Sequence, residues 1–444
     1  MNRQSKDIQV NLIYRYYFNN IDALNLFKTC KDQYNKIKLY KYKNAVKCED
    51  LNNYKNCIVT KIKNVREVNN LAKIWTNITH LTLSDDFYQQ VNNFSNFLTH
   101  LSFGDHFNQP VDNLPHTITH LLFGWNFDHP VDHLPNSITH LKFGYRFNHS
   151  VNHLPNSITH LQVGAYFNQR VDHLPNCITH LTFDYWFNQE IDNLPKSITH
   201  LTLSSLFNHT VDNLPACVTH LEFGNDFNQP VDHLPNYITR LTFVGSFDQP
   251  LDHLPNSITH LIFGYNSNFN LPIDNLPNSI THLTLGRYFN QSVDNLPHYI
   301  THLSFGEWFN HPISNLPNLI SDLTLGNSFN CRIDNLPNSI IHLTLGYHFN
   351  HPVDNLPNSL TLLHFGSCFN RPVNKLPNSI THLQFGKYFN QPVNKLPKSL
   401  THLKFGKCFN RLVNNLPKFI TYLQFGEGFK RLRSIPKSIT HVTF

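Results

Sequence analysis

The sequence has no long apolar run. No stretch approaches the ~20 apolar residues that a membrane-spanning helix needs. The N-terminus shows no secretory leader, because Asp7 and Asn11 interrupt the one candidate apolar stretch. The eight cysteines lack paired spacing, which favours free thiols in a reducing compartment. We therefore expect an intracellular protein with no membrane partner.

Sequence motifs of catalytic and cofactor-binding sites are also missing. The chain has neither a glycine-rich phosphate loop nor a dinucleotide fingerprint. Ser, His and Asp recur together throughout, so their combination is no sign of a catalytic triad. We expect no catalytic residues, no cofactor and no enzyme activity.

Charge is sparse and uneven. Residues 1–80 hold 15 Lys and Arg against 6 Asp and Glu, whereas the remainder holds 20 against 23. The basic head could contact acidic partners or nucleic acid, but a lysine-rich solvated surface is the simpler interpretation. The near-neutral remainder is unsuited to nucleic acid, so we expect protein partners.

What the sequence does contain is a 20-residue period running from about Ile78 to Phe444. The unit at 107–126 reads FNQPVDNLPHTITHLLFGWN, and the segment typified by I-T-H-L-x-F occurs in 19 copies. A two-residue insertion around Ser267 and Asn268 is the main irregularity. A period of this length predicts a solenoid of stacked turns.

The spacing L-x-x-x-I-x-x-L-x-F within a unit resembles the core of a leucine-rich repeat. It places Leu121 and Phe123 inward on a short strand, with His120 and Leu122 outward. Pro115 belongs in the turn before the strand and Gly124 ends it. Twenty residues leave no room for a helix, so the return path should be extended or a 3₁₀ turn. We predict a β-rich solenoid of about 19 turns with one parallel sheet.

Two polar columns follow from the repeat. Asn108 and its equivalents should bond the backbone of the next turn as an asparagine ladder. Histidine occupies the first outward strand position in 15 of 19 turns, interrupted by Arg240, Asp322, Leu362 and Tyr422. Zinc ligands converge on one point, whereas side chains in a flat row point in parallel directions away from the sheet. We therefore favour a stacked structural ladder of histidines and expect no metal site. Mutual repulsion should place these pKa values below ~6.5.

Positions that vary between turns are the candidates for recognition. They lie mainly in the two residues after each strand, with Arg240 added from the histidine row. Aromatic residues concentrate there, as protein-binding surfaces require. The alternative is that these rings stack on one another and shield the strand edge. The candidates are Trp125, Tyr145, Tyr185, Trp186, Arg240, Tyr288, Trp308, Tyr347 and Tyr388.

The units resemble the FNIP repeat, named for a Phe-Asn-x-Pro core. The core stands here as FNQP at Phe107–Pro110, Phe227–Pro230 and Phe389–Pro392. The resemblance covers about residues 78–444. It implies a leucine-rich-repeat-like array that binds proteins, in a family known mainly from social amoebae and large DNA viruses.

Residues 1–43 carry a second resemblance. Two apolar helical faces flank a turn at Asn19–Asp22, and D-A-L-N-L-F-K-T-C-K resembles the F-box pattern, although the usual leading Leu-Pro is missing. The resemblance implies that Leu12, Ile13, Leu24 and Phe27 bind the adaptor subunit of a ubiquitin ligase. Residues 44–77 would be a degenerate first repeat or linker.

These features favour a substrate-recognition adaptor of a cullin-RING ubiquitin ligase, whose solenoid at 78–444 binds a target protein. The alternative is a repeat scaffold without a ubiquitin link, the helices serving only as a cap. Oligomerisation through a strand edge at Phe444 is a third possibility. The location would be cytoplasmic or nuclear, or the host cell cytoplasm if the chain is viral.

Overall fold

A computed structural model describes residues 46–47, 61–65, 78–91, 94–430 and 438–443. Leu12, Ile13, Leu24, Phe27 and the rest of the F-box-like segment lie outside the described residues, as does Phe444. The chain divides into two compact units, residues 1–185 and 186–444.

Both units consist of short parallel strands, one per repeat. The first unit contains β1 (Val46–Lys47), β2 (Lys61–Val65), β3 (His80–Leu83), β4 (His100–Ser102), β5 (His120–Leu122), β6 (His140–Lys142), β7 (His160–Gln162) and β8 (His180–Thr182). The second contains β9 (His200–Thr202), β10 (His220–Phe223), β11 (Arg240–Phe243), β12 (His260–Phe263), β13 (His282–Thr284), β14 (His302–Ser304), β15 (Asp322–Thr324), β16 (His342–Thr344), β17 (Leu362–His364), β18 (His382–Gln384), β19 (His402–Lys404), β20 (Tyr422–Gln424) and β21 (His441–Thr443).

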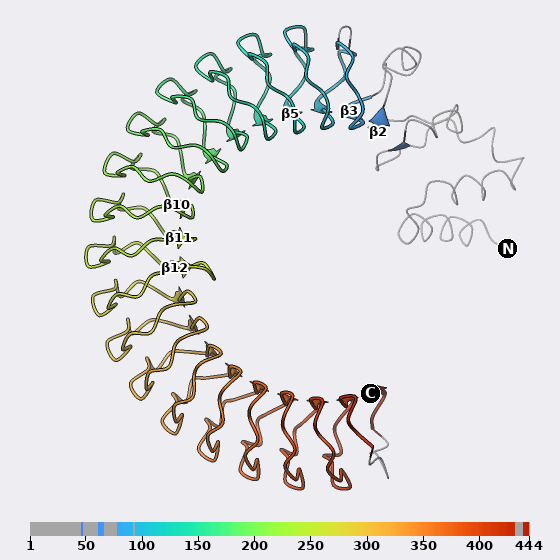
Figure 1. The fold of residues 1–444 in the computed structure, drawn as a ribbon, viewed down its shortest axis with the longest axis vertical. Helices are drawn as coiled ribbons and strands as arrows, with labels where there is room; N and C mark the ends of the chain where they lie inside the picture. The colour runs from blue at the N-terminus through green and yellow to red at the C-terminus, as the bar shows by residue number, and fades with distance from the viewer. Residues whose placement is uncertain (1–45, 48–60, 66–77, 92–93, 431–437, 444) are drawn as a thin grey trace, which may run out of the picture. The chain divides into compact units, whose positions relative to one another are not determined.

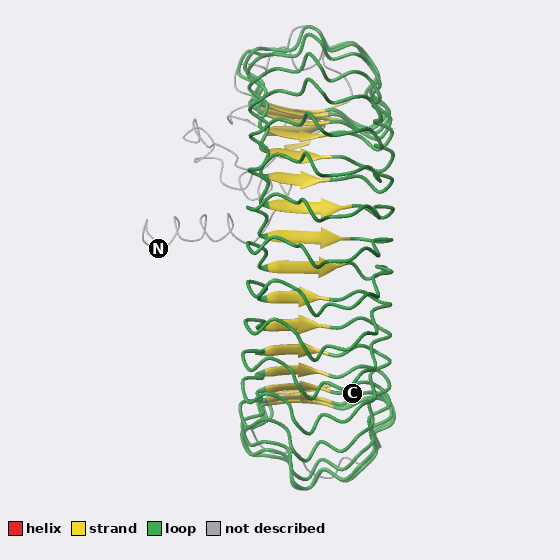
Figure 2. Cartoon of the chain, turned by 90° about the vertical axis from the view of Figure 1, so that its left-hand side faces the viewer, coloured by secondary structure: helices red, strands yellow, loops and turns green. Residues whose placement is uncertain are grey.

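Within each unit every strand pairs with the next in the chain, and from β3 onward the partner comes from the following repeat. His120 of β5 lies opposite His140 of β6, for example, and Thr324 of β15 opposite Thr344 of β16. Figure 2 shows the strands stacked in this order, with loops on both sides. The predicted parallel β-solenoid is confirmed for the described residues, which contain no helix. The strands β1 and β2 fall within residues 44–77.

The core follows the predicted alternation. Leu121 and Phe123 are buried under β5, whereas His120 is half-buried and Leu122 exposed on the other face. The ring of Phe127 lies 3.8 Å from that of Phe123, and the Phe127 and Phe147 rings stack 6.2 Å apart between turns. Each turn therefore depends on its neighbours for burial, as expected of a repeat that cannot fold alone.

The return path of each turn contains no 3₁₀ helix in the described residues and consists of short hydrogen-bonded turns joined by irregular segments. The backbone N–H of Ile118 donates to the carbonyl of Pro115, closing the predicted turn before β5. A Cβ at Gly124 would clash with the carbonyl oxygen of Gly104, which explains the glycine after the strand. The asparagine ladder is confirmed: the N–H of Asn168 donates to Asn148 Oδ1 at 2.9 Å.

Each unit curves with its strands on the inner side (Figure 1). The ring spacings agree with this curvature. In the second unit, the His282 and His302 rings on the strand face lie 4.2 Å apart, whereas the Phe289 and Phe309 rings behind the sheet lie 6.2 Å apart. Successive turns are wedge-shaped, so the outward strand positions gather on a concave face.

Candidate binding surface

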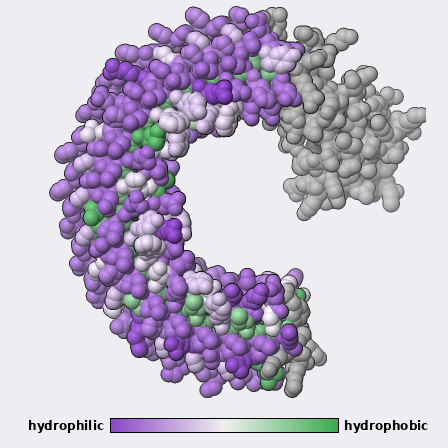
Figure 3. Space-filling model, viewed as in Figure 1, coloured by the Kyte–Doolittle hydropathy of each residue, from purple (hydrophilic) through white to green (hydrophobic). Residues whose placement is uncertain are grey.

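Three parallel files of side chains cover the strand side of each unit. The histidine file occupies the first outward position of each strand, and a second file of varied residues occupies the next outward position. The rim comprises the two residues that follow the glycine, or the residue in its place, after each strand. Figure 3 shows that the face in view is largely hydrophilic, with apolar residues scattered over it.

The histidine file is a stacked ladder, as predicted. In the first unit the rings of His80, His100, His120, His140, His160 and His180 lie 3.9–4.2 Å apart with interplanar angles of 10–13°. The spacing is shorter than the ~4.8 Å between strands because the file lies on the concave side.

Hydrogen bonds to the preceding threonine fix the tautomer of these histidines. Thr139 Oγ1 donates its one proton to the carbonyl of Thr119 at 3.1 Å and lies 2.9 Å from His140 Nδ1. With that proton already donated, Oγ1 must accept from Nδ1–H. The same pair of contacts recurs at Thr259 and His260. At neutral pH the file therefore presents Nε2 as a hydrogen-bond acceptor.

Protonation of the file is unfavourable. Burial lowers the pKa of His120, His140, His220, His260, His282 and His382, and neighbouring cations lower it further. The direction agrees with the sequence prediction, although burial ranks above the predicted repulsion. Arg240 lies within the file, where its charge acts on His220 and His260, so it is separate from the rim.

Asp322 breaks the file in the second unit. Its Oδ1 lies 2.6 Å from His342 Nδ1, and its Oδ2 lies 3.5 Å from His302 Nε2. Burial alone would raise the pKa of Asp322, but hydrogen bonds from Ser321 and His342 hold it below its usual value. No group of three or more His, Cys, Asp or Glu among the described residues has an arrangement that could hold a metal ion.

The rim aromatics form short stacks and remain half-exposed. Trp125 and Tyr145 stack 4.0 Å apart, and Tyr288 meets Trp308 edge-on at 4.9 Å. Trp125 and Trp308 are each 49% exposed. Tyr185, Trp186, Tyr347 and Tyr388 are also exposed, and Lys387 Nζ lies 5.0 Å from the Tyr388 ring centroid. The rim aromatics therefore stack on one another and still leave part of each ring exposed to solvent.

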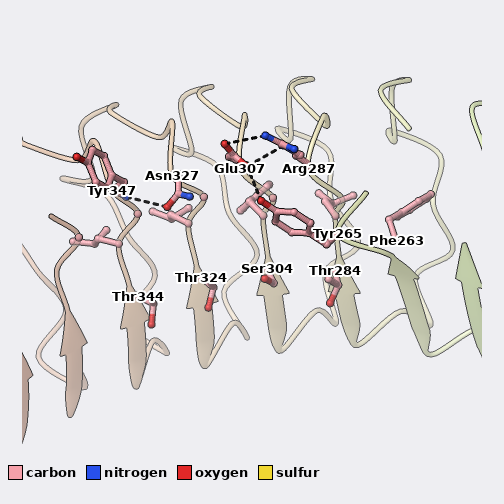
Figure 4. A pocket seen from close by; sticks show the side chains of 18 of the residues that line it. Phe263, Tyr265, Thr284, Arg287, Ser304, Glu307, Thr324, Asn327, Thr344 and Tyr347 are labelled. Atoms are coloured by element: carbon pink, nitrogen blue, oxygen red, sulfur yellow. Dashed lines mark hydrogen bonds and ion pairs between the residues drawn. The ribbon is translucent and has the colours of Figure 1, made fainter. Parts of the chain in front are cut away.

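A hollow of about 490 Å³ lies between the strands and the rim in the second unit (Figure 4). Its floor includes the outward hydroxyl side chains of β13 to β16, which we name the hydroxyl run: Thr284, Ser304, Thr324 and Thr344. Rim residues form its side, among them Tyr265, Arg287, Glu307 and the predicted Tyr347.

The two-residue insertion lies in the loop beside one end of the hollow. Ser267 is fully buried, and its N–H donates to the Gly264 carbonyl at 2.9 Å, so the added residues fold into the loop after β12. From that loop the Tyr265 hydroxyl reaches two turns onward and donates to Glu307 Oε2 at 2.7 Å. That hydrogen bond raises the pKa of Tyr265.

Arg287 lies between these two residues. Its Nε is 2.9 Å from Glu307 Oε2, and its guanidinium carbon lies 5.7 Å from the Tyr265 ring centroid and 5.6 Å from that of Tyr288. We name Tyr265, Arg287 and Glu307 the clip. Sequence reasoning missed the clip and the hollow; the available signals were the insertion and four successive small hydroxyl residues at one strand position.

Two further predictions concern the cysteines and membrane-spanning helices. Cys177, Cys217, Cys331, Cys368 and Cys408 are free thiols, as expected. Among the described residues, no helix has the length and apolarity to cross a bilayer.

Comparison with known proteins identifies the repeat. The FNIP repeat model matches residues 90–126, 110–146, 125–165, 147–185, 167–206, 227–266, 268–308, 309–348, 332–368, 369–408 and 409–444. No curated protein matches the chain.

Among solved structures, CroV588, described as a novel circular leucine-rich-repeat protein, is 41% identical with a TM-score of 0.75. The match covers 91% of this chain and 65% of CroV588, so this chain spans less than two thirds of that protein. YopM from Yersinia enterocolitica is 17% identical, with coverage of 80% and 90% and a TM-score of 0.47. InlJ from Listeria monocytogenes is 12% identical, with coverage of 65% and 63% and a TM-score of 0.44.

Repeat scaffolds of this type typically bind proteins rather than catalyse reactions. Together with the stacked turns, the family matches lead to one conclusion: this chain belongs to the FNIP repeat family and has a fold of the leucine-rich-repeat type.

Proposed function

We propose that the chain is a protein-binding scaffold that holds a partner against the concave strand face and the rim. The half-exposed rim aromatics are the observation that carries this proposal. Large aromatic side chains contribute much of the binding energy at protein interfaces, and rings already fixed by stacking lose little entropy on binding. The open files of polar side chains beside them suit the margin of such an interface.

Single rim substitutions test the proposal. Trp186→Ala and Trp308→Ala should each weaken binding of a cross-linked and purified partner by about tenfold or more, the loss typical of an interface hot spot. Tyr299→Ala is the matched control, because Tyr299 is 61% exposed but precedes a strand and lies outside the rim. Equal loss in the control and the rim variants, with the fold intact, would refute the rim as the binding surface.

We further propose that the protein is a substrate receptor of a cullin-RING ubiquitin ligase, acting in the cytoplasm or nucleus. The F-box-like pattern around Leu24 and Phe27 favours this role. In the full chain, Leu24→Glu with Phe27→Glu should abolish binding of the purified ligase adaptor subunit, while Asn25→Ala should retain it. Absence of adaptor binding by the unmodified chain would leave the scaffold without a ubiquitin link.

A further inference from the structure

We propose that the hollow over β13 to β16 binds an extended, uncharged peptide segment of about four residues, running across the strands. This inference rests on the proposed protein-binding function and assigns it a particular subsite. The hollow, the hydroxyl run and the clip are three separate features of this one stretch of the second unit.

The dimensions suit a short extended segment. Four strands span three spacings of ~4.8 Å, or about 14 Å, and extended chain covers ~3.3–3.6 Å per residue, so about four residues fit. The volume of about 490 Å³ falls in the range of ligand-binding clefts, and the hollow is open to solvent, which suits a segment lying along the surface. The hollow exists here because small residues occupy the second outward position in four successive turns, with the larger Ile262 and His364 in the turns on either side.

The hydroxyl run offers unused hydrogen-bonding capacity. Within the described residues, none of its four side chains makes a hydrogen bond to protein, and all are accessible to solvent. By contrast, Thr301 Oγ1 is committed to the Thr281 carbonyl at 3.2 Å and to His302 Nδ1 at 2.9 Å. A hydroxyl can both donate and accept, and each residue of an extended peptide offers one N–H and one C=O.

Charge and stacking determine the class of ligand. Arg287 and Glu307 are the charged residues that line the hollow, and they neutralise each other across 2.9 Å. Neither a polyanion nor a polycation would therefore gain from this site. The guanidinium of Arg287 lies over one face of the Tyr265 ring, which leaves Tyr347 as the lining ring best placed for stacking. An uncharged peptide fits the row of hydroxyls better than a glycan does, because each of its residues supplies one N–H and one C=O.

The clip fixes the end of the hollow. The hydrogen bond between Tyr265 and Glu307 joins residues 42 positions apart, across two turns of the solenoid. Tyr347 lies on the rim side further along the hollow (Figure 4). We infer that a peptide is seated on the hydroxyl run between these two tyrosines.

A selection experiment on the full chain tests the assignment. A phage library of random dodecapeptides should yield sequences sharing a short uncharged core rich in small residues. A fluorescein-labelled peptide from the selection then reports affinity by anisotropy. Combining Thr284→Val, Ser304→Ala, Thr324→Val and Thr344→Val keeps side-chain shape while removing the hydroxyls, and should weaken binding by at least about tenfold.

Thr202→Val with Thr242→Val is the control, at the same strand position outside the hollow, and should change affinity less than about twofold. The subsite is refuted if the four-hydroxyl variant binds as tightly as the control, if selection yields only charged peptides or none, or if neutral oligosaccharides bind there instead. Retention of a full protein partner by the four-hydroxyl variant would overturn this subsite while leaving the scaffold function standing. If the rim variants lose the partner and the four-hydroxyl variant keeps it, the scaffold function stands and the peptide subsite is refuted.

Discussion

Acidification should destabilise the solenoid through the histidine file. At the 4.2 Å that separates the His120 and His140 rings, two imidazolium ions repel by about 4 kcal/mol at an effective dielectric of about 20 and about 1 kcal/mol in bulk water. Because the rings are partly exposed, we take about 1–2 kcal/mol per adjacent pair. The six stacked histidines from His80 to His180 form five such pairs, so full protonation of this run would cost roughly 5–10 kcal/mol.

The direction of the pH effect follows from the linkage between proton binding and unfolding. Folded-state pKa values of His120 and His140 lie below the unfolded value of ~6.5, so the unfolded chain binds more protons in mild acid. Stability is therefore complete above about pH 6.5, declines as the pH falls from there toward the lower folded-state values, and levels off below them. The melting temperature, followed by circular dichroism, should drop between about pH 7.5 and about pH 5.5.

Two controls separate repulsion from burial. Replacing alternate members, His100, His140 and His180, with Asn doubles the spacing between the remaining rings and should reduce the drop. Raising NaCl to about 0.5 M should also reduce it, because salt screens repulsion but not the cost of burial. An unchanged melting temperature across the pH range, or an equal drop in the Asn variant, would refute the reasoning.

Three further predictions concern the stacking of turns, each measured by denaturant unfolding. Gly144→Ala should lower the free energy of unfolding by about 1–3 kcal/mol, because its Cβ meets the Gly124 carbonyl oxygen; Lys142→Ala, on the exposed face of β6, should have little effect, and equal losses would be inconsistent with the clash. Phe127→Ala should cost about 3–5 kcal/mol by leaving a cavity in the phenylalanine stack, and a loss below about 1 kcal/mol would mean that the stack repacks freely. Asn148→Ala should cost about 0.5–1.5 kcal/mol through the lost bond to Asn168 N–H, whereas Asn148→Asp, which keeps the acceptor as Asp128 does, should be nearly neutral; a larger loss in the Asp variant would contradict the ladder.

The repeat pattern was sufficient to predict most of the scaffold. A fixed period leaves one way to align Leu121 and Phe123 with their equivalents, so strand positions, inward faces, the asparagine ladder and the histidine stack all followed. The short spacing between the histidine rings could not be predicted from the period, because it depends on the curvature. The curvature in turn depends on the relative bulk of residues in front of and behind the sheet.

The hydrogen bond between each histidine and its preceding threonine could not be predicted from the sequence, for a different reason. Strict alternation would point Thr119 inward, opposite to His120. Instead, the N–H groups of both residues donate to the Thr99 carbonyl at 2.8 and 3.0 Å, so the backbone is irregular there and the threonine hydroxyl turns toward the imidazole. The clip around Arg287 likewise depends on contacts between rim side chains of three different turns, and the period does not specify these variable residues.

The uniform register between strands has a consequence for the gene. Excising residues 147–166 would set Phe167 against Phe127 and His180 against His140, and the same carbonyls and ring faces would meet across the join. Recombination between repeats can thus lengthen or shorten the molecule in whole turns without redesigning its interior. The reach of the concave face can therefore vary independently of the side chains displayed on any one turn.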